Sequence, residues 1–364
     1  MNRGALIINY TGHGGVNGLA HEKILEKTHI TSWRNSGKYP LFMTATCEFS
    51  RYDDYDASKK QEVTTAGEEV LLNPRGGSIA LFTTTRLVYS GPNHVLNEKF
   101  YERVFEKRDN GDCYRLGDII KYSKNEAGAG VNKRNFTLLG DPSTSLSFPK
   151  QIVVTDSVNH QALENYSDTL SALDFVTISG HVQNRSGALM ENFNGSVIPI
   201  VYDKKTNLKT LANDGGSPLD FKTRNSTLYK GNATVENGRF TFSFYVPKDI
   251  GYSMGEGKIS YYGYSEDTDA HGSSFGVTIG GLGDFTDLDT VGPELQIYMN
   301  DSLFRNGGIV NNSPELLVYV KDPYGINTTG NGIGHDITAT LNDDRINAII
   351  LNEYYQADAD SYSS

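Results

Sequence analysis

Short apolar runs alternate with amphipathic stretches over the first 150 residues of the chain. Three of the apolar runs are six or seven residues long, which is typical of strands buried on both faces of a sheet: ALIINY (5–10), LFMTAT (41–46) and SIALFTT (78–84). Apolar spacing, together with capping and charged residues at the ends, predicts helices between and after them. The predicted helices cover residues 20–27, 64–73, 92–111 and 115–128. Strands and helices in this order predict a parallel sheet with right-handed crossovers.

The pattern changes at the segment LLGDPSTSLSFPK (138–150), after which no long amphipathic helix is predicted. Runs of alternating apolar and polar residues follow, separated by turn clusters such as ENG and NDGG, and this combination indicates a β-sandwich. These runs are residues 176–182, 196–202, 239–247 and 258–265. The segment 280–294 is predicted to be a linker, and the runs ELQIYMN and ELLVYVKD begin another β unit.

The predicted fold class is therefore multidomain, with an α/β part followed by all-β parts. Residues 1–150 form an incomplete parallel α/β domain, residues 151–285 an Ig-like β-sandwich, and residues 286–364 the start of a further β domain. The polar C-terminal stretch DADSYSS is expected to be frayed or truncated. A single strand that leads at once into a glycine-rich loop indicates a fragment that has lost its signal sequence and first strands.

Charge is distributed unevenly along the chain. Residues 1–150 contain 20 Lys and Arg and 17 Asp and Glu, a net charge of +3, whereas the remainder contains 13 and 27, a net charge of −14. The acidic second half argues against nucleic acid as a partner. No apolar stretch approaches the roughly 20 residues of a membrane-spanning helix. Two cysteines are too few for a disulfide framework, so their number does not indicate a redox compartment.

The glycine-rich stretch NYTGHGG (9–15) follows the first predicted strand and carries His13. In an open parallel sheet, ligands bind beyond the carboxyl ends of the strands, and the second predicted strand delivers Cys47 to the same edge. A thiol nucleophile needs a neighbour that favours the thiolate or handles the proton of the leaving group, and an imidazole does both. The backbone N–H groups of Gly14 and Cys47 are predicted to form an oxyanion hole, which requires a backbone unobstructed by side chains.

Each of these residues also has a purely structural interpretation. The glycines around His13 fit a tight turn with an exposed histidine, and a cysteine at a strand end is often inert core. Cys113, between two predicted helices, is predicted to be such a core cysteine, and a Cys47–Cys113 disulfide remains an alternative. His21 and His29 are predicted to be surface residues at the two ends of the first predicted helix. The joint placement of Cys47 and His13 at two strand ends favours the chemical interpretation.

Two acidic clusters are candidates for a metal ion: Asp53, Asp54 and Asp56 in RYDDYD, and Asp284, Asp287 and Asp289 in GDFTDLDT. Neither cluster has the spacing of an EF-hand. Both are predicted to be solvated loops, with structural calcium as the alternative, and no cofactor is predicted.

The stretches NYTGHGG and TATCEFSRYDD, whose histidine and cysteine are 34 residues apart, resemble the catalytic pair of the gingipain-type, caspase-like cysteine peptidases. The segments LLGDPS, GPELQIYMND, GINTTGNGIGHDITATLND and ILNEYY extend the resemblance over nearly the whole chain, towards the sortases of the type IX secretion system. The resemblance implies a caspase-like domain in which His13 is the catalytic histidine and Cys47 is the nucleophile. It also implies that a substrate-pocket wall is formed by Gly15, Thr84, Thr85 and Arg86.

By the same resemblance, the enzyme is expected at the cell surface, on the extracellular face of the outer membrane. It is expected to cleave the C-terminal sorting domain from secreted proteins and to pass the acyl group to anionic lipopolysaccharide. Outer-membrane secretion components are expected as further partners. The alternatives are a secreted gingipain-like endopeptidase and a non-catalytic surface scaffold of the secretion system. The family places an acidic residue upstream of the catalytic histidine, and Met1–Gly4 contains none. The fragment itself is therefore expected to have an incomplete site, and an inactive fragment is one of the alternatives.

Overall fold

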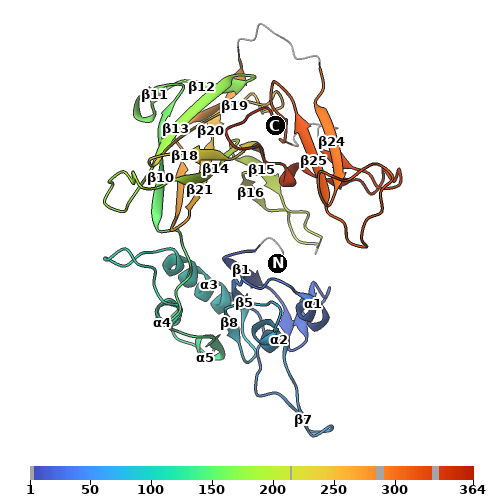
Figure 1. Cartoon of the computed structure of the whole chain (residues 1–364). Coiled ribbons are helices and arrows are strands. Elements are labelled where there is room, and N and C mark those ends of the chain that lie inside the picture. The colour runs from blue at the N-terminus through green and yellow to red at the C-terminus, as the bar shows by residue number, and fades with distance from the viewer. Residues whose placement is uncertain (1–3, 214, 284–290, 330–335) are drawn as a thin grey trace. The chain divides into compact units, whose positions relative to one another are not determined.

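The computed structural model describes residues 4–213, 215–283, 291–329 and 336–364 (Figure 1). The chain divides into two compact units, Met1–Phe148 and Pro149–Ser364. The further boundary predicted at residue 285 stays a prediction. Among the helices of the described residues, none is long and apolar enough to cross a membrane.

The first unit is built on a four-stranded sheet in the order β1-β5-β8-β9. Its strands are β1 (Ile7–Thr11), β5 (Leu41–Ala45), β8 (Ala80–Thr84) and β9 (Phe136–Leu139). β1 is parallel to β5, and β5 is parallel to β8, as the three apolar runs predicted. β9 instead pairs antiparallel with β8, so the prediction of a purely parallel sheet is wrong at this edge. Periodicity alone does not distinguish an apolar run as short as FTLL from the loop around it.

Five helices accompany this sheet in the described residues: α1 (Lys27–Ser32), α2 (Ala66–Leu72), α3 (Ser90–Val104), α4 (Leu116–Glu126) and α5 (Asn132–Asn135). α2 begins with a capping box in which Thr65 and Glu68 satisfy each other's backbone N–H groups. The helix predicted over 20–27 is wrong, because this stretch forms turns followed by the short strand β4 (Leu25–Glu26). β4 pairs with β3 (Gly18–Leu19), which in turn pairs with β2 (Gly14–Gly15). Left-handed backbone at Ala20 and Lys23 interrupts any helix over this stretch.

Helices cover both faces of the sheet, with α1 and α2 on one side and α3 and α4 on the other (Figure 1). Alternate residues of β5 point to opposite faces. Met43 belongs to the apolar cluster of Phe100 and Ile119, on α3 and α4, whereas Phe42 belongs to that of Ile30 and Val70, on α1 and α2. Because β5 and β8 are wholly buried, their sequences are continuous apolar runs.

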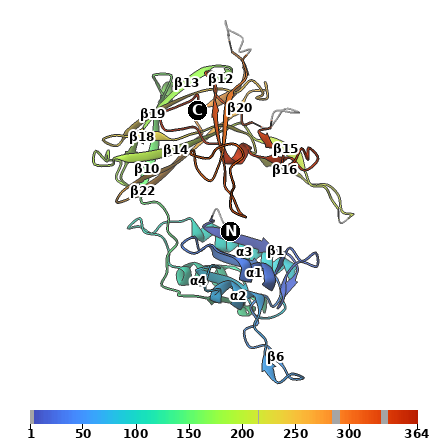
Figure 2. The ribbon, with the colours of Figure 1, turned by 45° about the vertical axis from the view of Figure 1, so that its right-hand side comes forward.

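The first unit also contains a loop after α3 and a short β-ribbon that are not part of the helix and sheet layers. α3 ends at Val104 rather than at residue 111, because residues 107–113 form a tight antiparallel turn. The ribbon of β6 (Tyr55–Asp56) and β7 (Gln61–Glu62) projects away from the rest of the unit (Figure 2).

The second unit is dominated by one nine-stranded sheet. Its strands are β10 (Gln151–Val158), β11 (Gln161–Ala162), β13 (Phe175–Gln183), β14 (Gly195–Tyr202), β17 (Thr227–Lys230), β18 (Ala233–Val235), β19 (Arg239–Tyr245), β21 (Lys258–Ser265) and β22 (Asp269–Ser274). The path runs β17-β14-β21-β22-β10-β13-β19, and β18 also pairs with β14. β18 continues into β19 through a turn in which Glu236 and Arg239 exchange two backbone hydrogen bonds of 2.9 Å. The two ends of the path are thus tied together, and the sheet curls into a near-barrel around one apolar core.

The four alternating runs predicted for this half are strands, namely β13, β14, β19 and β21. Their predicted arrangement as an Ig-like sandwich is not confirmed, because these four strands belong to one curled sheet rather than to two stacked sheets. Alternation along a strand shows that one face is buried, but it does not specify which strands pair.

Smaller sheets complete the second unit. They comprise β12 (Thr169–Ala172), β23 (Thr278–Leu282) and β20 (Gly255–Glu256), and the pairs β15 (Thr206–Lys209) with β16 (Asp220–Thr223), β24 (Glu294–Met299) with β25 (Leu316–Lys321), and β26 (Thr338–Ala339) with β27 (Ile349–Ile350). Two short 3₁₀ helices lie at Leu163–Asn165 and Asn352–Tyr354. The prediction of a frayed C-terminus is wrong. Ala357 is buried in the core of this unit, and Asp360 accepts hydrogen bonds from the N–H and hydroxyl of Thr234 at 2.8 and 2.6 Å.

Candidate active site

The loops that follow β1 and β5 run side by side. The parallel register pairs Thr11 with Ala45, and the N–H of Gly12 continues it with a 3.3 Å hydrogen bond to the carbonyl of Ala45. His13 and Cys47 follow directly on these two segments. The structure therefore brings the two predicted catalytic residues to the same edge of the sheet on adjacent loops, as expected for neighbouring parallel strands.

Gly14 makes the close approach of these loops possible. A Cβ atom at Gly14 would lie 2.6 Å from Oγ1 of Thr46 and 3.1 Å from the carbonyl oxygen of Gly18. Any side chain at this position would therefore push the His13 loop away from the end of β5. A Cβ atom at Gly15, in contrast, would have no atom within 4 Å, so the predicted substrate contact at Gly15 faces open space.

The backbone of His13 is held from two sides, and its side chain is exposed. Its carbonyl accepts hydrogen bonds from the N–H of Ala20 at 2.8 Å and from the hydroxyl of Tyr10 at 2.7 Å. Its imidazole has no hydrogen-bond partner among the described residues, but it contacts the ring of His21, with ring centroids 5.6 Å apart. This contact was missed by the sequence interpretation, which placed His21 at a helix end. The Asn17-Gly18 dipeptide, a hairpin signal, could have indicated the turn that brings it back.

Cys47 lies at a sharp bend beyond β5. Its thiol is half-buried and reduced, and its Sγ lies 3.6 Å from the carbonyl oxygen of Val88. Glu48 has a left-handed φ of 50°, which turns the chain away immediately after the thiol. The N–H of Glu48 then bonds the carbonyl of Arg86 at 3.3 Å, so the bend is tied to the loop after β8.

The two predicted oxyanion donors have no hydrogen-bond partner among the described residues. The N–H of Ala20 donates to the carbonyl of His13, so the next pair of the β2–β3 ladder, Gly14 and Leu19, is a non-hydrogen-bonded pair. In such a pair the N–H groups point away from the partner strand, and the Gly14 N–H therefore points away from β3. The N–H of Cys47 lies beyond the last paired residue of β5 and has no partner among the described residues. Among the described residues, both amides are thus free to donate, which is what an oxyanion hole requires of its N–H groups.

The residues predicted to form the pocket wall lie in different environments. Thr84 is fully buried, and its hydroxyl donates to the carbonyl of Thr46, so its side chain is not available to a substrate. Thr85 is half-buried and bonds the carbonyl of Asn135 through its N–H and its hydroxyl, at 2.8 and 3.2 Å. The guanidinium of Arg86 is exposed at this rim.

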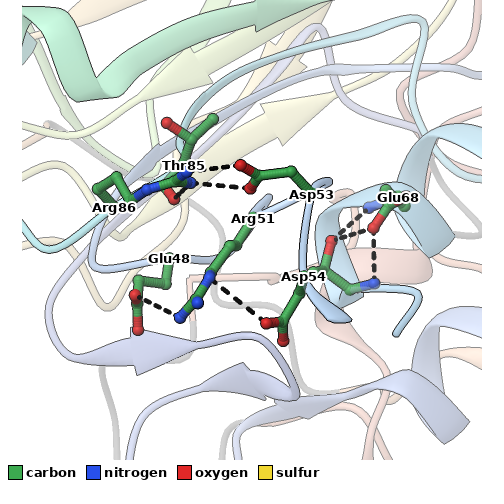
Figure 3. A network of polar contacts seen from close by, with 8 residues as sticks. Glu48, Arg51, Asp53, Asp54, Glu68, Thr85 and Arg86 are labelled. Carbon is green, nitrogen blue, oxygen red and sulfur yellow. Dashed lines mark hydrogen bonds and ion pairs between the residues drawn. The ribbon is translucent and has the colours of Figure 1, made fainter. Parts of the chain in front are cut away.

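Arg86 forms a bidentate ion pair with Asp53, at 2.9 and 2.5 Å (Figure 3). The hydrogen bond with Arg86 lowers the pKa of the Asp53 carboxyl below its usual value. The two other acids of this cluster, Asp54 and Asp56, pair with other cations: Arg51 at 3.4 Å and Lys59 at 3.3 Å. The three carboxylates thus do not converge, and in the described residues no group of acids, histidines and cysteines gathers that could hold a metal ion. The second predicted cluster, Asp284, Asp287 and Asp289, lies outside the described residues.

Cys113 differs from its prediction as a core residue. Its side chain is only half-buried, and the ammonium of Lys107 lies 2.9 Å from its Sγ. The alternative of a Cys47–Cys113 disulfide is wrong, since both residues are free thiols.

Part of the chain matches a known protein family. Residues 1–147 match the model of the family described as Peptidase family C25. Among solved structures, the chain is similar to dimeric latent PorU from Porphyromonas gingivalis, with 32% identity, 79% of this chain covered, 28% of that chain covered and a TM-score of 0.42. It is also similar to the Arg-specific cysteine proteinase gingipain R, with 15% identity, 76% and 54% covered, and a TM-score of 0.34. No curated protein matches the sequence.

The chain spans about a quarter of the latent PorU chain and about half of the gingipain R chain. The family match covers the first compact unit almost to its end. The resemblance to the gingipain-type cysteine peptidases is thereby confirmed, with residues 1–147 as the part that matches family C25.

Proposed function

We propose that the chain carries the Cys47 and His13 machinery of a cysteine peptidase that acts as a sortase-type transpeptidase on secreted proteins. The match to Peptidase family C25 supports a cysteine peptidase-type function. The finer assignment rests on the motif resemblance and on one observation in the structure. The unbonded N–H groups of Gly14 and Cys47 lie on the two adjacent loops that also carry the imidazole and the thiol.

The reaction follows from these groups. The Cys47 thiolate attacks the scissile carbonyl carbon, and the Gly14 and Cys47 amides stabilise the oxyanion that develops on its oxygen. The C–N bond then breaks, and protonated His13 gives its proton to the departing amine. The acyl group stays on sulfur as a thioester. An incoming amine attacks this thioester, loses a proton to His13 and releases the thiolate.

The proposed substrates are secreted proteins with C-terminal sorting domains, and the proposed acceptor is an amine of anionic lipopolysaccharide at the cell surface. In this role the departing amine belongs to the sorting domain, and outer-membrane secretion components deliver the substrate. Hydrolysis uses the same machinery, with water in place of the amine. The nature of the second nucleophile is therefore what separates a sortase from an endopeptidase.

A peptide p-nitrophenyl ester tests the proposal with the full chain. We expect release of p-nitrophenol and a thioester adduct on Cys47, detected by mass spectrometry, that disappears in Cys47→Ala and persists in Cys113→Ala. Adding an amino sugar should convert the adduct to a conjugated peptide. A conjugate supports the sortase, and the free acid alone supports an endopeptidase. Equal labelling of both cysteines would contradict either activity.

A further inference from the structure

Thr84 holds the segment around the nucleophile at two points. Its hydroxyl donates to the carbonyl of Thr46, the residue before Cys47, and its own carbonyl accepts the N–H of Ser50 at 2.9 Å. Thr84, Thr46 and Ser50 are all buried, at 0, 1 and 0% exposure. Thr84 therefore brackets the bend that carries Cys47, from inside the protein.

The bond to the Thr46 carbonyl also determines where the Cys47 N–H points. The carbonyl of Thr46 and the N–H of Cys47 belong to one peptide group, which is planar and trans, so the two bonds point in opposite directions. Because the hydroxyl of Thr84 holds the carbonyl on the buried side, the N–H is directed to the opposite side. Since this amide has no partner of its own among the described residues, the hydrogen bond at the carbonyl is what fixes the peptide plane.

The neighbouring buried hydroxyls bond one another rather than the backbone next to Cys47. The hydroxyl of Thr44 bonds that of Thr83 at 2.8 Å, and Thr83 contacts the hydroxyl of Ser50 at 3.0 Å. None of these three hydroxyls bonds the peptide between Thr46 and Cys47. Thr44 is thus a matched residue for comparison, with the same side chain and the same burial as Thr84.

We propose that Thr84 is a positioning residue that sets the orientation of the Cys47 amide as an oxyanion donor. The proposal rests on the proposed acyl-transfer function and gives Thr84 a role other than substrate contact. Thr84 touches neither the substrate nor the reacting atoms. It acts through the peptide between Thr46 and Cys47, and its hydroxyl is the group that matters.

Two reactions of the same thiol test this role in the full chain. Acylation by a peptide p-nitrophenyl ester passes through an oxyanion, whereas alkylation by iodoacetamide forms none. We expect Thr84→Val to slow acylation of Cys47 by about 10- to 100-fold, because loss of an oxyanion donor typically slows acyl transfer by about 100-fold or more. Alkylation of Cys47 should stay within about twofold of the wild type, because it needs only an accessible thiolate.

Thr84→Ser, which keeps the hydroxyl, should restore acylation, and the control Thr44→Val should not change the ratio of the two rates. Thr84→Ala replaces Thr84→Val if the latter does not fold, as judged by thermal unfolding. Equal slowing of both reactions, or no change in either, would overturn the role of Thr84 while leaving the proposed function intact. Absence of acylation in the wild type would instead overturn the proposed function and this role with it.

Discussion

The two cysteines of this chain are alike in their immediate surroundings and differ in what their backbone offers. Both are half-buried free thiols, and each has one close polar contact: the carbonyl oxygen of Val88 for Cys47 and the ammonium of Lys107 for Cys113. These direct contacts do not single out Cys47 as the nucleophile. The positions of the two cysteines in the fold distinguish them.

Cys113 lies in an antiparallel bridge with Lys107, so its backbone is engaged in local pairing. Its loop joins α3 to α4, after α3 has carried the chain back along the sheet. Cys47 lies at the carboxyl end of a parallel strand, with the loop of His13 beside it and an amide that has no partner in the part of the chain that the structure describes. The comparison teaches that the polar contact of a thiol does not by itself make a site for acyl transfer. Acyl transfer needs N–H donors and a proton donor in addition to the thiolate.

Among the variants considered, Gly14→Ala is expected to cause the largest loss of Cys47 acylation relative to Cys113 alkylation. The added methyl group would lie 2.6 Å from Oγ1 of Thr46 and 3.1 Å from the carbonyl oxygen of Gly18, and we expect the His13 loop to shift away from Cys47 in response. We expect ester acylation of Cys47 to fall by about 100-fold, the scale of a misplaced catalytic geometry. Iodoacetamide alkylation of Cys113, measured in the same sample, should not change. Gly91→Ala, where a Cβ has no atom within 4 Å, is the matched control, and unchanged acylation in Gly14→Ala would break the contrast.

A smaller effect is expected from His21→Ala, which removes the ring beside His13. The rings of His13 and His21 are exposed and 5.6 Å apart, so their contact is at the lower end of aromatic pair energies, about 0.5–1 kcal/mol. That corresponds to a loss of about two- to fivefold in Cys47 acylation. His94→Ala, at an exposed position on α3, is the control, and an equal loss in both variants would argue against a role for the ring contact.

The smallest effect, a change in the stability of the rim next to Cys47, is expected from breaking the ion pair of Arg86 and Asp53. Because the hydrogen bond from Arg86 lowers the pKa of Asp53, the pair stabilises the folded loop above the usual carboxyl pKa, and this is lost as the pH falls through the lowered value. An NMR titration of the Asp53 carboxyl should therefore have its midpoint below the usual value. Arg86→Gln should move the midpoint up, with thermal stability differing slightly from the wild type at neutral pH and converging below about pH 4. The same midpoint in both proteins would show that the pair does not persist in solution.

Much of the first unit could be predicted from its sequence because the decisive signals are local. The buried runs that became β5 and β8, the capped helix α2, and the strand ends that carry His13 and Cys47 all follow from the order of apolar, polar and glycine residues. The same holds for individual strands of the second unit. Strand partners do not follow from such signals. The antiparallel β9 and the near-barrel that replaced the predicted sandwich depend on contacts between distant segments.

The sequence by itself determined which residues are available for chemistry: a histidine among glycines and a cysteine at the end of a buried run, each just beyond a predicted strand. The tertiary structure decided how those residues are set. It placed His21 against His13, exposed Cys113 to Lys107, and enclosed Thr84 under the peptide of Cys47. The physical reason is that a side chain's partner and a peptide's orientation depend on atoms far apart in the sequence. Periodicity reports only the local environment of each residue.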